Sequence, residues 1–304
     1  MIVVVCPGQG SQTPGFLSPW LEVPGLPERL ARYSDAAGMD LAAHGTVSDA
    51  DTIRDTKVAQ PLIVAAGLLT LFALLEGRRD QIGGIAGHSV GELTAAAAAE
   101  ILSESDAMSL VAERGRAMAD AAALAPTGMS AVVGANEAEL LAMLSGLGLE
   151  PANFNGGGQV VVAGALDALE KLKEAPPPGS RVIPLQVAGA FHTRYMAPAV
   201  ERLGTAAAAL QAGDPILPIW SNRDGHRVTG GREYLDLLVG QVSSPVRWDK
   251  CMDSFAAAGV NGVIEVAPAG ALVGLAKRGL KGVPAIAVKT PEDLHAAIEM
   301  IENS

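Results

Sequence analysis

The sequence has few aromatic residues and few cysteines, and its positively charged side chains are outnumbered by negative ones. Aromatic residues make up only 4% of the 304 residues, although 49% are hydrophobic. The core must therefore be built mainly from alanine, valine, leucine and isoleucine, a composition typical of a sheet covered by helices. The length suffices for one large domain, or for a large and a small one.

The two cysteines, Cys6 and Cys251, are far apart and lack the spacing of a metal-binding motif. A disulfide between them is one interpretation, and two buried thiols in a reducing cytoplasm is the one that we favour. We therefore expect a cytoplasmic protein. The net charge of −11 argues against a nucleic-acid partner, because it would repel the phosphates at long range.

Long uninterrupted apolar runs are also scarce. We expect glycines and charges to break each apolar stretch well short of the roughly 20 residues that a membrane span needs. The N-terminal run MIVVVCPGQG lacks a basic segment and a cleavage site, so we do not expect a secretory signal. These features together predict no membrane partner.

A short glycine-rich stretch, AGHSVGEL at 86–93, contains a Gly-x-Ser-x-Gly pentad around Ser89. Such a pentad recurs by chance, so an ordinary serine in a glycine-rich loop is one interpretation. A strand-like segment, QIGGIAG, precedes the serine, and a strong helix former, ELTAAAAAEIL, follows it. A serine between a strand and a helix is the context of a nucleophile elbow.

Strand-like and helical segments alternate along the chain, which predicts an α/β fold with a mostly parallel sheet. A long helix is expected in TKVAQPLIVAAGLLTLFALLEG, with Pro61 near its first turn. From Thr127 the order becomes β-α-β-β-α-β, the pattern of a ferredoxin-like unit. We predict an α/β-hydrolase-like catalytic body formed by residues 1–126 and 190–304, and an inserted ferredoxin-like small subdomain at 127–189.

A serine hydroxyl becomes a good nucleophile only when a base removes its proton, and that base should be a histidine distant in sequence. His88 is adjacent to Ser89, and its side chain is expected to point away, which indicates a structural role. His192 lies in VAGAFHTRYM, where the chain returns to the body and a cleft would form. Its position leaves open whether it is the base or a packed histidine. The other histidines lie in loops or in a polar helix: His44, His226 and His295.

Several separated motifs span nearly the whole chain. They are PGQGSQ at 7–12, VAQPLIVAAG at 58–67, GHSVGE at 87–92, ERGRAM at 113–118, NFNGGGQVVVAG at 153–164, GAFHTRYM at 189–196, VGQVSSPVRW at 239–248 and EVAPAGALVGLAKR at 265–278. In this order they resemble the malonyl-CoA:acyl carrier protein transacylases of type II fatty acid synthesis, and the acyltransferase domains of polyketide synthases. Each motif is short, but their joint specificity is high. The resemblance also implies a ferredoxin-like insertion.

The resemblance implies roles for individual residues. Ser89 matches the acylated nucleophile and His192 the general base and acid. The main-chain carbonyl of Gln241 matches the group that replaces the usual acid of a triad. The main-chain N–H groups of Gln9 and Val90 match the oxyanion hole.

Two further matches concern the acyl group. Arg114 matches the arginine that binds the malonyl carboxylate, which a guanidinium can hold bidentately. Spacing alone favours a surface arginine paired with Glu113 or Asp120, and Arg116 should point elsewhere on the helix. Phe191 in GAFH resembles the malonyl-selective form, in which it narrows the space beside the malonyl C2.

The implied reaction is a ping-pong transfer from malonyl-CoA to the phosphopantetheine thiol of acyl carrier protein, through malonyl-Ser89, by a monomer without a metal or redox cofactor. Fatty acid synthesis is the expected pathway. A serine hydrolase or thioesterase would share the elbow, and a non-catalytic docking subunit would share the fold. A malonyl transferase of a polyketide or malonate decarboxylase system is the third alternative.

The carrier protein of this family is acidic, and so is this chain, so docking would require a local basic surface. AKRGLKG, with Lys277, Arg278 and Lys281, is one candidate, and EKLKE at 170–174 is another. A solvated charged face is the alternative for both.

Overall fold

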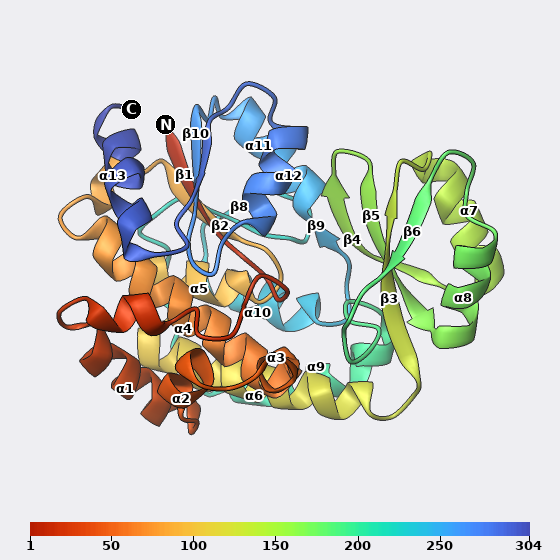
Figure 1. The fold of residues 1–304 in the computed structure, drawn as a ribbon, viewed down its shortest axis with the longest axis horizontal. Coiled ribbons are helices and arrows are strands. Elements are labelled where there is room, and N and C mark those ends of the chain that lie inside the picture. The colour runs from red at the N-terminus through yellow and green to blue at the C-terminus, as the bar shows by residue number, and fades with distance from the viewer.

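The computed structural model describes residues 1–304 and contains two sheets (Figure 1). The larger sheet has six strands, in the order β11 (Ala285–Ala287), β10 (Gly262–Glu265), β1 (Ile2–Cys6), β2 (Gly84–Gly87), β7 (Ile219–Trp220) and β8 (Arg227–Val228). Neighbours are parallel except for β7 and β8, which pair antiparallel. The predicted mostly parallel sheet is confirmed.

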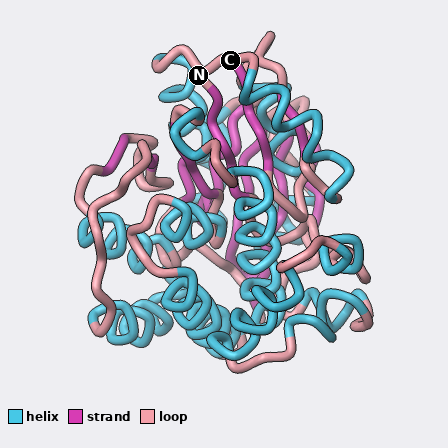
Figure 2. The backbone as a smooth tube through the Cα atoms, turned by 90° about the vertical axis from the view of Figure 1, so that its left-hand side faces the viewer, coloured by secondary structure: helices cyan, strands magenta, loops and turns pink.

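Strand β1 shows how this sheet lies between two helical layers. Ile2, Val4 and Cys6 belong to one hydrophobic cluster, and Val3 and Val5 belong to another. This alternation follows from the period of two residues in a strand. All five residues are buried, as expected for a parallel strand that is covered on both faces. Figure 2 shows the strands enclosed among helices.

The helices divide between these two clusters. The first cluster includes residues of α1 (Leu26–Ala37), α4 (Thr56–Leu75), α5 (Gly91–Ala98), α6 (Glu104–Ala122), α9 (Ala197–Ala208), α10 (Gly231–Gln241) and α13 (Leu294–Glu302). The second includes residues of α11 (Trp248–Ala257) and α12 (Ala271–Gly279). Two short helices, α2 (Leu41–Thr46) and α3 (Ala50–Arg54), connect α1 to α4. Short 3-10 turns span Ser18–Glu22, Arg79–Gln81, Arg194–Met196 and Pro291–Asp293.

Helix α4 corrects two predictions. It is long and apolar enough, by length and composition, to cross a membrane, so the expectation that every apolar stretch falls short was wrong. Gly67 does not interrupt the helix, and 83% of its most apolar window is buried inside the protein. Asp55 caps the helix by accepting a hydrogen bond from the Lys57 N–H at 2.9 Å. The helix begins at Thr56 as expected, but Pro61 lies inside it, just beyond the first turn.

The smaller sheet has five strands, in the order β6 (Arg181–Pro184), β3 (Thr127–Val133), β5 (Gln159–Ala165), β4 (Glu150–Gly156) and β9 (Val246–Arg247). The first four pair antiparallel, and β9 pairs parallel with β4. Together with α7 (Glu137–Leu147) and α8 (Leu166–Glu174), the first four strands follow the predicted β-α-β-β-α-β order. Figure 1 shows α7 and α8 on the side of this sheet that faces away from the body.

The two faces of the smaller sheet have different partners. Val132 and Val162 pack with α7 and α8, whereas Met129, Ala131 and Val161 join the main cluster of the body. We propose that residues 127–189 form the small subdomain, because their strands and helices share a separate hydrophobic cluster. Strand β9 joins the sheet from outside these boundaries, and its two residues carry no strand pattern of their own.

Candidate active site

Ser89 lies in a sharp turn between β2 and α5. Its φ is 53°, a left-handed conformation that is strained for a residue with a side chain. The turn is tight because Gly87 and Gly91 pack closely. A Cβ on Gly87 would lie 2.0 Å from the main-chain carbon of Gly91, and one on Gly91 would lie 2.1 Å from the carbonyl oxygen of Cys6. The turn therefore holds the Ser89 side chain at the end of the strand.

His192 approaches Ser89 although 103 residues separate them in sequence, and its Nε2 lies 2.7 Å from the Ser89 Oγ. Its Nδ1 lies 2.8 Å from the main-chain carbonyl of Gln241. Because a carbonyl only accepts hydrogen bonds, Nδ1 carries the proton and Nε2 is free to accept one. Burial, and next the charge of Arg114, lower the pKa of His192 to about 3. The resting imidazole is therefore neutral, as a base must be.

The other histidines make different contacts. His88 Nε2 lies 3.0 Å from the Asn155 Oδ1, and its ring packs edge-on against Trp248, which fits the predicted structural role. The remaining three lie beside residues close in sequence: His44 beside Ser48, His226 beside Asp224 and His295 beside Glu299.

Arg114 is only 1% exposed and projects from α6 toward the serine. Its Nη1 donates to the Gln60 side chain at 2.7 Å, and its Nη2 donates to the Gln241 side chain at 2.9 Å. Nη2 also lies 3.4 Å from the Ser89 Oγ, and Nε has no hydrogen-bond partner in the protein. Burial lowers the pKa of Arg114 to about 10, which the charge of Glu92 partly offsets. The guanidinium thus stays charged at neutral pH beside the hydroxyl.

The surface pairing that spacing favoured for Arg114 was wrong. Glu113 and Asp120 both pair with Arg202, and Glu113 also pairs with Arg116. Arg114 lies on the opposite, buried side of α6 because the helical period separates it from these neighbours.

A cavity of about 420 Å³ adjoins Ser89, between the body and the smaller sheet. Gln9 and Val90 line it, and neither main-chain N–H donates a hydrogen bond within the protein. Phe191 lies on its wall. The smaller sheet contributes apolar lining through Met129, Ala131 and Val161. A larger cavity of about 750 Å³ lies beside α1 and α4 and contains no nucleophile paired with a base.

Comparison with known proteins identifies the family of this chain. Residues 3–292 match the family model described as "Acyl transferase domain". The malonyl CoA-acyl carrier protein transacylase of Mycobacterium tuberculosis (strain ATCC 25618 / H37Rv) is 51% identical over 97% of this chain and 98% of the relative. The transacylase of Escherichia coli (strain K12) is 34% identical over the same shares. The chain belongs to the malonyl CoA-acyl carrier protein transacylases.

Solved structures of such transacylases share this fold. The crystal structure of MCAT from Mycobacterium tuberculosis has a TM-score of 0.94 at 50% identity and covers 98% of this chain and 99% of that one. A complex titled as a type II PKS acyl-carrier protein with its malonyl-transacylase has a TM-score of 0.93 at 29% identity, with the same coverage.

In this transacylase, sequence reasoning missed a layer of residues behind Ser89 and His192. The Asn222 Oδ1 accepts from the Ser89 N–H at 2.8 Å, and its Nδ2 donates to the Gly87 carbonyl at 2.7 Å. Asn222 therefore ties together both sides of the elbow. Glu92, 1% exposed, accepts from the main-chain N–H of Asn222 at 2.6 Å. In the sequence, the only indication that Glu92 has a special role was its position in GHSVGE, at the start of a largely apolar helix.

Both cysteines are buried and free. Burial raises the pKa of the Cys6 and Cys251 thiols well above their usual range, which disfavours the reactive thiolate forms. The favoured interpretation of two buried thiols was correct, and the disulfide is excluded.

Proposed function

We propose that this transacylase moves a malonyl group from malonyl-CoA to the phosphopantetheine thiol of an acyl carrier protein, in cytoplasmic fatty acid synthesis. The observation that carries the proposal is the meeting of three groups. A serine hydroxyl contacts a neutral histidine and, on another side, a buried guanidinium. The pair supplies a nucleophile, and the guanidinium suits an acyl group that ends in a carboxylate.

The first half of the reaction acylates Ser89. As the Ser89 Oγ attacks the thioester carbonyl, its proton passes to the Nε2 of His192. The oxyanion accepts hydrogen bonds from the main-chain N–H groups of Gln9 and Val90, and such donors are typically worth about 3–4 kcal/mol each. The C–S bond breaks, His192 returns the proton to the CoA sulfur, and malonyl-Ser89 remains. The Gln241 carbonyl holds the imidazole tautomer throughout.

The second half uses the same groups. His192 takes the proton of the phosphopantetheine thiol, whose sulfur attacks the ester carbonyl of malonyl-Ser89. The C–O bond then breaks, and the proton returns to the serine oxygen. No step requires a metal or redox cofactor, and one chain supplies every group, so we propose that the monomer is the active unit.

Selectivity for malonyl would come from two residues. Arg114 would bind the terminal carboxylate, with its Nε free of protein partners. Phe191, on the cavity wall, would narrow the space beside the malonyl C2. Discrimination against a single methyl group is worth only about 1–3 kcal/mol, so Phe191 is the weaker determinant of the two.

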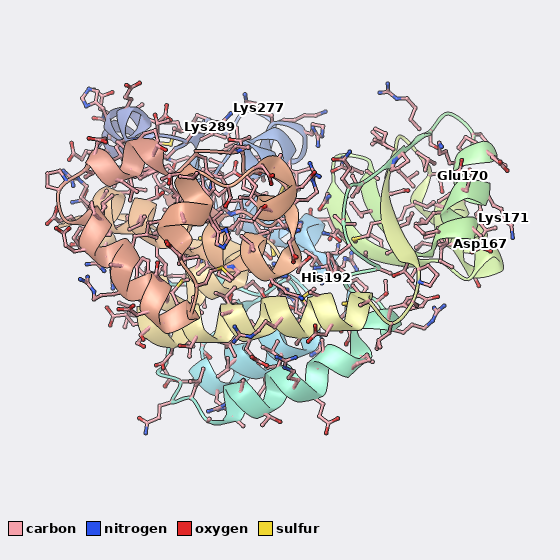
Figure 3. The ribbon with its side chains drawn as sticks, turned by 60° about the horizontal axis from the view of Figure 1, so that its bottom comes forward. Asp167, Glu170, Lys171, His192, Lys277 and Lys289 are labelled. Carbon is pink, nitrogen blue, oxygen red and sulfur yellow. The ribbon has the colours of Figure 1, made fainter.

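For docking of the acidic carrier protein we favour Lys277, Arg278 and Lys281. Arg278 lines the cavity, and the nearby Lys277 and Lys281 are exposed. The alternative segment EKLKE is largely neutralised, because Lys171 pairs with Asp167 and Lys173 with Glu170. Figure 3 places Glu170 and Lys171 on the outer helix of the small subdomain, far from His192. The net charge of −11 gives no support to nucleic acid as a partner, and we propose none, nor a membrane.

Intact mass spectrometry tests the proposal. The protein mixed with malonyl-CoA should gain the mass of one malonyl group, and Ser89→Ala should gain none. Addition of a pantetheinylated carrier protein should move that mass to the carrier. Release of free malonate without transfer would favour a hydrolase or thioesterase, and absence of any adduct would favour a docking subunit.

A further inference from the structure

Glu92 is a buried carboxylate that the mechanism above does not use. It lies in the first turn of α5 and is absent from the wall of the cavity. Its Oε1 accepts from the main-chain N–H of Asn222, and its Oε2 accepts from the Gln241 Nε2. Burial raises the pKa of Glu92 to about 8, although the Asn222 N–H, the charge of Arg114 and the Gln241 side chain all act to lower it. Both oxygens face N–H donors, which is the geometry that favours the ionised form.

That arrangement fixes the orientation of the Gln241 carboxamide. Its Nε2 faces acceptors only: Glu92, the Ser89 carbonyl at 3.3 Å and the Asn222 Oδ1 at 3.2 Å. Its Oε1 accepts from Arg114 at 2.9 Å. A flipped carboxamide would place its NH₂ group against the guanidinium and its oxygen against the carboxylate, so both contacts would become repulsive.

Arg114 itself has no carboxylate within hydrogen-bond distance. Its hydrogen bonds go to the neutral carboxamides of Gln60 and Gln241 and to the Ser89 hydroxyl. Glu92 lies on the far side of Gln241, and its charge raises the pKa of Arg114 and so favours the cation. The direct hydrogen-bond partners of Arg114 in the protein are therefore all uncharged, and its Nε has none.

We propose that Glu92 is a positioning residue that, through the Gln241 carboxamide, holds Arg114 in place for the carboxylate of the acyl group and so contributes to malonyl selectivity. This inference rests on the proposed function, since it requires Arg114 to bind that carboxylate.

The variant Glu92→Gln isolates this role. Glutamine keeps the size of the side chain but offers one acceptor and one NH₂ group to the two donors on Asn222 and Gln241. Either one donor loses its partner or the Gln241 carboxamide flips, and a flip costs Arg114 its hydrogen bond. Loss of a hydrogen bond to a charged group corresponds to roughly a ten- to hundredfold change in binding.

The experiment compares transfer from malonyl-CoA and from acetyl-CoA, because acetyl has no carboxylate. Glu92→Gln should lower kcat/KM for malonyl-CoA by roughly ten- to a hundredfold, mainly through KM. It should change acetyl transfer much less. The matched control is Glu113→Gln, the same change on the helix that carries Arg114, where the acid faces the surface pair with Arg202. The control should leave both substrates unchanged.

An equal loss with both substrates, or unchanged malonyl selectivity, would overturn the inference. If Glu92→Gln does not fold, Glu92→Asp provides a second test. It keeps the carboxyl group but withdraws it by one methylene from the Gln241 side chain, so the same selective loss is expected, and an unselective effect would count against the proposal. Failure of the proposed function would appear differently, as a native protein that forms no malonyl adduct.

Discussion

The serine and histidine that meet at the end of β2 both have strained backbones. Ser89 and His192 have φ angles of 53° and 62°, conformations that cost about 1–3 kcal/mol each for residues with side chains. The surrounding contacts oppose relaxation. The Ser89 N–H is held by Asn222 at 2.8 Å, and the His192 N–H donates to the Val242 carbonyl at 3.1 Å. These hydrogen bonds therefore hold both backbones in their strained conformations, and in those conformations the two side chains are in contact.

Arg114→Ala should separate the two acyl substrates. The variant removes the only guanidinium beside Ser89, so kcat/KM for malonyl-CoA should fall by about a hundredfold or more, since charge-assisted hydrogen bonds contribute about 1.5–3 kcal/mol each. Use of acetyl-CoA relative to malonyl-CoA should rise. Arg116→Ala is the control because its side chain pairs with Glu113 at the surface. Survival of malonyl preference in Arg114→Ala would refute the assignment of Arg114 to the carboxylate.

The lowered pKa of His192 predicts an unusual pH profile. Its folded value of about 3 lies below the usual histidine value of about 6.5, so the base stays neutral as the pH falls through 6.5. We expect kcat/KM for acetyl-CoA, whose acyl group has no carboxylate for Arg114 to bind, to show no loss from protonation of His192 between pH 8 and about pH 5. An acid limb with a midpoint near 6.5 would contradict the burial of this imidazole.

The same shift has a consequence for stability. Below pH 6.5, His192 binds a proton in the unfolded state but stays unprotonated in the folded state. Its contribution therefore lowers the free energy of unfolding increasingly as the pH falls from 6.5 toward 3. Urea unfolding across this range should be compared between the native protein and His192→Gln, in which the dependence should be weaker.

At the scale of elements, the elbow depends on close approach between β2, β1 and the start of α5. Both Gly87 and Gly91 are positions where any side chain would collide with main-chain atoms. Main-chain atoms cannot move aside as a flexible side chain can, so the turn must deform if a methyl group is added. The two glycines of the pentad are thus required by the packing of the turn, whatever the role of the serine between them.

Gly91→Ala should destabilise the protein by about 1–3 kcal/mol, as overpacking does, and should also reduce formation of malonyl-Ser89. Gly146→Ala is the matched control, because a Cβ on this residue of α7 meets nothing within 4 Å. It should stabilise the protein by roughly 0.5–1 kcal/mol through helix propensity. Free energies of unfolding in urea measure both effects, and an equal response of the two variants would show that the elbow is not tightly packed.

Elements were predictable where a local pattern was strong. The strand before Ser89 and the helix after it follow from residue composition over short windows. Strand β9 was missed because its two residues form a strand only through β4. The helices α1, α2 and α3 could not be predicted from the sequence. Their amphipathic patterns are short, and proline and glycine interrupt the segment that contains them.

At the scale of the whole molecule, the chain is acidic, and so is the carrier protein that we propose as its partner. The net charge of −11 makes long-range attraction unfavourable, so docking depends on local positive charge near the cavity. Lys277 and Lys281 form no ion pair within the protein and are exposed. Lys277 lies in the last turn of α12 and Lys281 follows the end of this helix, which also contributes residues to the cavity wall.

Reversal of Lys277 and Lys281 to glutamate should raise KM for the carrier protein several-fold at low salt, and less at high salt, because exposed charges are screened. Acylation of Ser89 by malonyl-CoA should be unaffected. The control reverses Lys171 and Lys173 on α8, which are paired with neighbouring acids. An unchanged KM in the Lys277 and Lys281 variant would remove this surface from the docking site.

The sequence by itself determined the strand–serine–helix turn, the alternating strands and the order of the small subdomain, because these depend on residues close together in the chain. It also pointed to His192, but left its role open. Only the tertiary structure decided that His192 contacts Ser89, that Arg114 is buried rather than paired at the surface, and that Glu92 and Asn222 support them. Such contacts join segments a hundred or more residues apart. They arise from how whole elements pack, which no local pattern specifies.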